Sequence, residues 1–188
     1  MRISVKLAPT FAYPEMERFW READDLGFEA VWNYDHFYGL VKNETPTFEG
    51  WTTLAAMGVV VRRARVGCMV TGVTYRNPAI LAKMAVTVDH ITGGRMNFGI
   101  GAGWHEDEHR GYGIDFPGPG ARVEMLEEAL TVIRRLWTEE SVNFAGRFFT
   151  LNDALCEPKP VQRPHPPIVI GGSKPRGPLP LLARCAAL

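Results

Sequence analysis

The sequence predicts an α/β protein of the (β/α)8 TIM-barrel type, of which it holds only the N-terminal portion, with about five βα units and an incomplete barrel. Short β-branched runs are each followed by an amphipathic stretch, which is the pattern of βα units around a parallel sheet. Polar or glycine-rich clusters follow these runs at residues 35–36, 71–77, 101–105 and 171–173. A barrel gathers the carboxyl ends of its strands on one face, whereas an open doubly wound sheet would spread several of these clusters apart.

The first two units establish the pattern. We expect a strand at residues 3–7, followed by a helix that Pro14 opens and that runs to Gly27. The second strand is expected at residues 29–33. After a loop rich in turn formers, the apolar residues 50–61 predict the second helix.

The third and fourth strands are expected at residues 66–71 and 96–101. Between them, Pro78 opens a helix whose apolar residues share one face. The pair Gly93-Gly94 then provides its C-terminal stop.

Residues 121–137 show the clearest amphipathic helix of the chain. Its first turn is acidic and its last turn is basic, as the helix dipole favours. A small β-hairpin is expected at residues 142–144 and 147–150. A proline-rich connector then leads into the fifth strand, at residues 168–170.

Composition and charge exclude several classes of partner. Lysine plus arginine equals aspartate plus glutamate at 21 each, so the chain has no overall field to hold nucleic acid or an anionic membrane. Cys68, Cys156 and Cys185 lie far apart without C-x-x-C spacing, which argues against a disulfide framework or a zinc site. No apolar run approaches the roughly 18 residues that span a bilayer. We therefore expect a cytoplasmic protein that acts on a small molecule.

Eight short motifs follow one another along the chain. In order, they are Asp35-His36-Phe37, Thr71 to Pro78, Asp89 to Arg95, Gly99 to Trp104, Arg122 with Glu128-Ala129, Phe144 with Gly146, Pro158-Lys159-Pro160, and Pro167 to Gly172. This succession resembles the luciferase-like monooxygenase family (bacterial luciferase-like) over residues 1 to about 173. The resemblance is closest to the branch that depends on the deazaflavin coenzyme F-420, although the branch that uses flavin mononucleotide (FMN) shares nearly all of the motifs.

The resemblance implies a (β/α)8-barrel oxidoreductase that transfers hydride, or oxygen, between coenzyme F-420 and a small organic substrate. It also implies a homodimer for the full-length protein. One alternative is an FMN-dependent monooxygenase that acts on paired donors with O2. A second alternative, from a different class, is an inactive gene fragment.

His36 is the candidate catalytic residue. An imidazole titrates near neutrality and can give or take a proton beside a ring that undergoes hydride transfer. A histidine held at a strand end for structure is the competing interpretation, and the resemblance favours catalysis. Asp35 either holds His36 in one tautomer or binds the cofactor, unless it is a solvated loop carboxylate.

Thr71, Gly72 and Val73 are expected to bind the cofactor. The resemblance implies that they form a bulge that backs the central ring, with a non-proline cis peptide bond between Gly72 and Val73. The competing interpretation is a strand end with a simple glycine kink.

Two glycine clusters suit the anionic tail of the cofactor. Ala102 with Gly103, and Gly171 with Gly172 and Ser173, leave backbone N–H groups free to approach a phosphate. The second cluster is expected at a helix N-terminus, where the dipole favours an anion. Tight-turn geometry alone is the alternative for each glycine.

Two tempting motifs are rejected. Residues 105–109 match the H-E-x-x-H pattern of zinc proteases, but Gly111 and Gly113 break this segment and no apolar stripe precedes it. We expect instead a short solvated helix over the mouth of the active site. Residues 99–103 imitate the dinucleotide fingerprint, but the third glycine comes one residue early and the run belongs to the fourth strand.

Trp104 departs from the sugar-phosphate dehydrogenases of the F-420 branch, which carry a glutamate at this position. Glucose 6-phosphate is therefore not the substrate we expect. Trp104 is expected to wall an apolar pocket, and Glu108, one helical turn later, is the nearest acid.

The C-terminal end predicts an incomplete barrel. A (β/α)8 barrel usually needs about 250 residues. Residues 1–173 are expected to form the N-terminal part of the barrel domain, and residues 174–188 an atypical tail, truncated or frameshifted, whose prolines oppose a helix. Open sheet edges would then make the isolated chain poorly soluble or self-associating, with weak cofactor binding.

Overall fold

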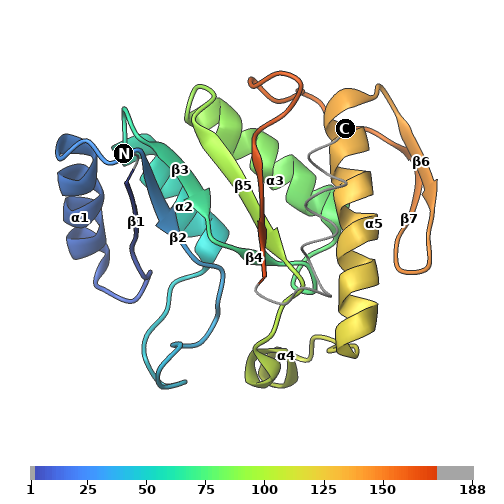
Figure 1. The fold of residues 1–188 in the computed structure, drawn as a ribbon, viewed down its shortest axis with the longest axis horizontal. Coiled ribbons are helices and arrows are strands. Elements are labelled where there is room, and N and C mark those ends of the chain that lie inside the picture. The colour runs from blue at the N-terminus through green and yellow to red at the C-terminus, as the bar shows by residue number, and fades with distance from the viewer. Residues whose placement is uncertain (1–2, 173–188) are drawn as a thin grey trace.

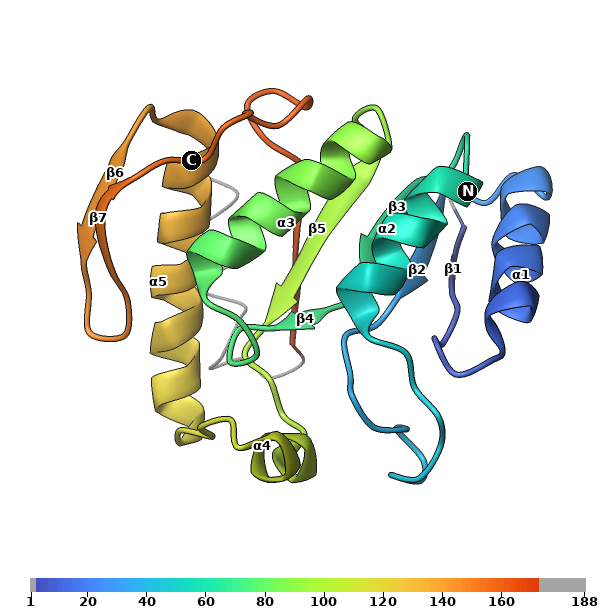
Figure 2. The same cartoon turned by 180° about the vertical axis from the view of Figure 1, so that it is seen from behind.

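The computed structural model describes residues 3–172, in which a parallel sheet is covered on one face by helices (Figures 1 and 2). Its elements in chain order are β1 (Ser4–Lys6), α1 (Tyr13–Asp25), β2 (Ala30–Asn33), α2 (Gly50–Val60), β3 (Arg65–Cys68), β4 (Thr71–Gly72), α3 (Pro78–Ile91), β5 (Met96–Gly101), α4 (Glu106–Tyr112), α5 (Pro119–Thr138), β6 (Val142–Ala145), β7 (Thr150–Ala154) and β8 (Ile168–Gly171). Ser173 and the predicted tail at residues 174–188 lie outside the described residues.

The sheet confirms the predicted βα order. Strands β1, β2, β3 and β5 pair in parallel in that sequence, and β8 pairs in parallel with β5. The two-residue strand β4 also pairs with β5. Within residues 3–172 the sheet stays open between β1 and β8, so the described part is an incomplete barrel.

The helices begin close to the predicted residues because local capping fixes their first turns. The side chain of Asn77 accepts a hydrogen bond from the Ala79 N–H at 2.8 Å, with Pro78 in the first turn of α3. At α2, the Glu49 carboxylate accepts from the Trp51 and Thr52 N–H groups at 2.9 and 2.6 Å. Of the helices in the described region, none has the length and apolar composition to cross a membrane.

The predicted hairpin is confirmed, with a longer turn than expected. Strands β6 and β7 pair antiparallel, with Ala145 opposite Thr150. The Gly146 N–H donates to the Phe149 carbonyl at 2.9 Å, so residues 146–149 form the turn and the second strand begins at Thr150 instead of residue 147.

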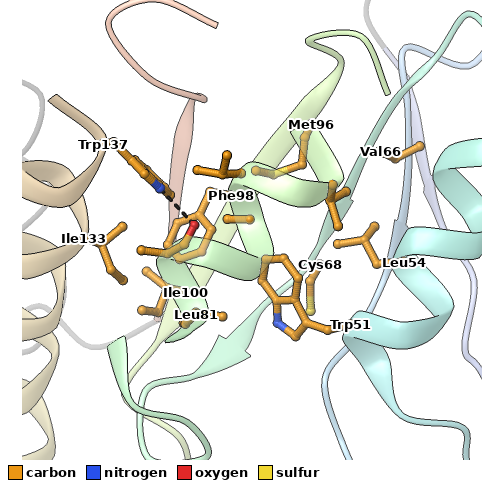
Figure 3. Packing of buried hydrophobic residues seen from close by; sticks show 14 of the residues in the cluster. Trp51, Leu54, Val66, Cys68, Leu81, Met96, Phe98, Ile100, Ile133 and Trp137 are labelled. Atoms are coloured by element: carbon orange, nitrogen blue, oxygen red, sulfur yellow. Dashed lines mark hydrogen bonds between the residues drawn. The ribbon is translucent and has the colours of Figure 1, made fainter. Parts of the chain in front are cut away.

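The hydrophobic core lies between the sheet and its helices (Figure 3). Phe98 and Ile100 of β5 point toward α3 and α5, where the fully buried Trp137 packs edge-on against Phe98 at a centroid distance of 5.1 Å. The Trp137 indole N–H donates to the Ala82 carbonyl at 3.1 Å, so its polar atom is paired inside the core. Burying a side chain such as that of Phe98 stabilises the fold by roughly 1.5–3 kcal/mol.

Side chains alternate between the two faces of a strand. Gly99 and Gly101 alternate with Phe98 and Ile100 along β5, so these glycines lie on the face opposite the core. A Cβ added at Gly99 would lie only 1.9 Å from the Cys68 carbonyl oxygen. Cβ atoms added at Gly101 and Gly171 would lie 2.9 and 2.5 Å from a methyl carbon of Val70. These glycines therefore leave the space that the Val70 side chain occupies.

The bulge lies earlier in the chain than predicted. Strand β3 ends at Cys68, and the non-proline cis peptide bond joins Met69 and Val70, so its predicted place between Gly72 and Val73 was wrong. Thr71 and Gly72 already pair again with β5 as strand β4. The chain leaves the sheet at Val70, where Gly99 and Gly101 of β5 and Gly171 of β8 leave room for the Val70 side chain. The position of the bulge therefore depends on residues of other strands.

Gly99→Ala is expected to lower the free energy of unfolding by about 1–3 kcal/mol, the usual cost of extra atoms in a packed core. The new methyl group would meet a backbone carbonyl, which cannot swing aside. Gly120→Ala is the matched control, since a Cβ there meets nothing within 4 Å and alanine favours the helix. Denaturant unfolding of both variants checks this prediction, and a Gly99→Ala chain as stable as the parent would contradict it.

Candidate active site

A cavity of about 200 Å³ opens at the carboxyl ends of the strands. In Figure 1, this is the end of the sheet where the strand arrows of β2 and β5 point and where α4 lies. Five predicted site residues line it, namely Asp35, His36, Thr71, Gly72 and Gly103. Its other walls come from Lys6, Tyr34, Leu40, Met69, Val70, Tyr75 and Trp104. Residues 30 or more positions apart in the sequence thus meet on one barrel face, as the motif positions predicted.

The remaining predicted residues do not line this cavity. Val73 is buried at 3% exposure, and Ala102 packs partly buried against the core. Gly171 lies beside Val70 at the end of β8, with the exposed Gly172 after it. Ser173 is outside the described residues, as is any helix that follows it.

His36 lies in the cavity wall with 8% of its surface exposed. Its Nδ1 atom is 2.9 Å from Oε2 of Glu108. The rings of Tyr34 and Trp104 contact it edge-on at centroid distances of 5.5 and 5.4 Å. These contacts fix the ring, and Nε2 is the nitrogen left for a ligand because Nδ1 is engaged.

Glu108 is the carboxylate that holds His36, and it is fully buried. Its Oε1 accepts hydrogen bonds from the Phe37 and Tyr38 N–H groups at 2.7 and 2.8 Å, and its Oε2 also accepts from the Tyr75 hydroxyl. Burial raises the pKa of Glu108, but the bonds from His36, Tyr75 and Tyr38 outweigh it and lower the pKa to about 2. Glu108 is therefore ionised at neutral pH.

The sequence predicted a solvated helix here, and this prediction was wrong for one face of α4. Glu108 and His109 are both fully buried, while Glu106 and Arg110 face solvent. The Nδ1 atom of His109 is 2.8 Å from the His105 carbonyl, and its Nε2 is 2.7 Å from Oγ1 of Thr74. Both ring nitrogens are thus engaged by the protein, and α4 is tied to the loop after β4.

Asp35 belongs to a separate buried network. Its carboxylate forms two bonds with the Arg76 guanidinium, at 2.6 and 2.9 Å, and accepts the Thr71 hydroxyl at 2.7 Å. The Trp51 indole N–H donates to that hydroxyl at 2.5 Å, and Arg76 also pairs with Glu49. The alternative of a solvated loop carboxylate is therefore excluded for Asp35, which is fully buried. Glu108, and not Asp35, hydrogen-bonds to the ring of His36.

Sequence reasoning missed several residues of the site. Met69 and Val70 were assigned to a regular strand, and the hydroxyl of Tyr75 was not linked to Glu108. Lys6 is the last residue of β1, so its place at the carboxyl end of a strand was the signal that could have found it.

Comparisons with known proteins agree with the fold. The family described as luciferase-like monooxygenase matches residues 2–184. The chain is 33% identical over 168 residues to an F420-dependent glucose-6-phosphate dehydrogenase of Kineococcus radiotolerans, covering 88% of this chain and 49% of that protein. It is 38% identical over 97 residues to an FMNH(2)-dependent dimethylsulfone monooxygenase of Pseudomonas putida, covering 52% of this chain and 27% of that protein.

A solved structure extends the similarity over the whole chain. The crystal structure of monooxygenase RslO1 from Streptomyces bottropensis matches with a TM-score of 0.83 at 28% identity, covering 100% of this chain and 57% of that one. The chain thus spans about half the length, or less, of the curated relatives described above.

Proposed function

The chain belongs to the luciferase-like monooxygenase family, and we propose that it forms part of the active site of an oxidoreductase that transfers hydride between coenzyme F-420 and a small organic substrate. The observation that carries this proposal is the position of His36. Its ring is fixed in the wall of a cavity whose other wall is the bulge from Met69 to Gly72.

The residues present suit a flat aromatic ring. Gly72 and Gly103 contribute only backbone to the cavity wall, and Trp104 and Met69 supply apolar surface. A cavity of about 200 Å³ is below the roughly 300–1,000 Å³ typical of ligand pockets. The described residues therefore have room for part of such a cofactor.

We assign the cofactor contacts to the residues that the family motifs indicate. Asp35, Thr71, Gly72 and Gly103 would meet the ring system, since they line the cavity. Roles in cofactor binding for the other predicted residues stay predictions. They are Val73, Ala102, Gly171, Gly172 and Ser173.

When bound, the deazaflavin ring accepts or supplies the hydride. His36 accepts or donates the accompanying proton. In the oxidation of an alcohol, Nε2 of His36 takes the hydroxyl proton as the hydride leaves carbon. In the reduction of a carbonyl, the protonated imidazole of His36 donates this proton to the carbonyl oxygen. Trp104 covers the mouth beside His36 with an apolar surface, so we expect a substrate less polar than glucose 6-phosphate.

An FMN-dependent monooxygenase is the second candidate, and the identity to the FMNH(2)-dependent relative favours it. The F420-dependent relative matches a larger share of the chain, 88% against 52%, and supports the first candidate. The relative affinity of the chain for F-420 and FMN distinguishes the two candidate functions.

Titration of the 188-residue chain with oxidised and reduced F-420 and FMN, followed by fluorescence, tests this proposal. We expect saturable binding of F-420 with a lower Kd than FMN. Gly72→Val should weaken it, because a Cβ at residue 72 already lies 2.8 Å from the Tyr75 ring in the cavity wall. Gly118→Val is the control, with nothing within 4 Å of its Cβ. Tighter binding of FMN would favour the second candidate, and binding of neither cofactor by this chain or by a full-length control with a completed barrel would contradict both.

A further inference from the structure

Glu108 connects segments that lie far apart in the sequence. It is separated by 72 residues from His36 and by 33 from Tyr75, yet its Oε2 lies within hydrogen-bond distance of the His36 Nδ1 atom and accepts from the Tyr75 hydroxyl. Its Oε1 accepts the two consecutive N–H groups of Phe37 and Tyr38. One buried carboxylate on α4 therefore fixes the loop that follows β2, the loop that follows β4 and the His36 side chain.

The chemistry of this carboxylate dictates the position of a proton. With a pKa of about 2, Glu108 is ionised at neutral pH and can only accept hydrogen bonds. The Nδ1 atom of His36, 2.9 Å away, must therefore carry the hydrogen. In the neutral ring, Nε2 then holds a free lone pair, which is the form that a general base requires.

The other groups around the His36 ring leave this arrangement undisturbed. Tyr34 and His105 contact it only through their rings, at 5.5 and 5.8 Å. Asp35, the neighbouring carboxylate, is taken up by Arg76 at 2.6 Å. Burial and Glu108 together raise the pKa of Tyr75, which keeps its hydroxyl protonated as a donor.

We propose that Glu108 is a positioning residue that holds His36 in its Nδ1–H tautomer and aims Nε2 into the cavity. The catalytic consequence rests on the proposed function of His36. The tautomer itself does not, because it follows from contacts within the protein. Glu108 also anchors α4, so its test needs a readout that a purely structural role would not change.

That readout is the protonation of the two ring nitrogens, measured by ¹⁵N NMR on labelled chain without cofactor. The chain has five histidines, and His36→Asn identifies the signals of His36 by their loss. We expect Nδ1 to carry the proton and Nε2 to be bare in the neutral ring. A neutral ring with its proton on Nε2 would overturn the proposal, whatever the enzymatic activity.

Glu108→Gln provides the second test, since an amide of the same shape no longer forces the hydrogen onto Nδ1. We expect the Nε2–H tautomer to become populated and turnover to fall by up to about 10²-fold. Glu106→Gln, in the exposed first turn of the same helix, should change neither. A folded Glu108→Gln chain with unchanged His36 signals would refute the proposal. If this variant fails to fold, the measurement on the unaltered chain still decides between the tautomers.

Discussion

Replacing His36 with alanine in a protein with a completed barrel is expected to lower turnover by about 10²–10⁴-fold and to leave cofactor affinity nearly unchanged. General acid–base groups typically contribute this much to the rate. The ring contacts Glu108, Tyr34 and Trp104 at the cavity wall, so its removal takes away the proton carrier and leaves the bulge and Gly103 in place. Steady-state kinetics together with the fluorescence titration measure both quantities.

His90→Ala is the matched control for this variant. His90 is exposed on α3, its Nε2 atom lies 2.9 Å from the Lys159 carbonyl, and it does not line the cavity. It should leave turnover unchanged. Equal turnover of the His36→Ala chain and the parent would remove His36 from the mechanism.

Arg76→Met is expected to lower the free energy of unfolding by about 3–5 kcal/mol, the usual cost of leaving one member of a buried ion pair alone. Asp35 is fully buried, and Arg76 provides two of its bonds, at 2.6 and 2.9 Å. The same substitution also frees Glu49, which caps α2. Denaturant unfolding measures the loss.

Two further variants show whether the loss of stability in Arg76→Met comes from the buried ion pair. Arg21→Met breaks an ion pair of similar length, 2.5 Å, but an exposed one, and should cost only about 0.3–0.5 kcal/mol. The double variant Asp35→Asn/Arg76→Met should recover part of the lost stability, because no charge is then buried alone. If Arg76→Met and Arg21→Met cost the same, the buried network does not stabilise the fold as described.

Most of the fold could be predicted because it is encoded locally. Pro14 and Pro78 sit in the first turns of their helices, and the glycines after residue 92 end α3, so short-range signals suffice. The bulge could not be placed from the local sequence. It depends on Gly99, Gly101 and Gly171, which lie on other strands and leave room for Val70.

The residues of the candidate site that directly follow strands could be predicted, and the contacts between them could not. His36 and Gly103 were found because each follows a strand, and the ends of parallel strands meet. The partnership of His36 with Glu108 was not predicted, since it depends on how α4 docks across 72 residues of sequence. For the same reason the sequence offered Asp35, which is adjacent to His36, as one candidate for the contact that Glu108 makes.

Gly171 shows that a glycine after a strand fits two structural roles, ligand binding and close packing. Its position after a strand suggested a backbone cradle for phosphate, and in the structure its missing side chain makes room for Val70. Close packing and ligand approach both require glycine, so the residue type alone does not separate them.

A crystal structure of the chain with bound F-420 tests the central claim most directly. We predict that the deazaflavin ring lies in the cavity against the bulge of Met69 and Val70, with Nε2 of His36 facing the substrate side of the ring and Nδ1 still bonded to Glu108. A ring bound elsewhere on the molecule, or a His36 side chain turned away from it, would contradict the proposed active site.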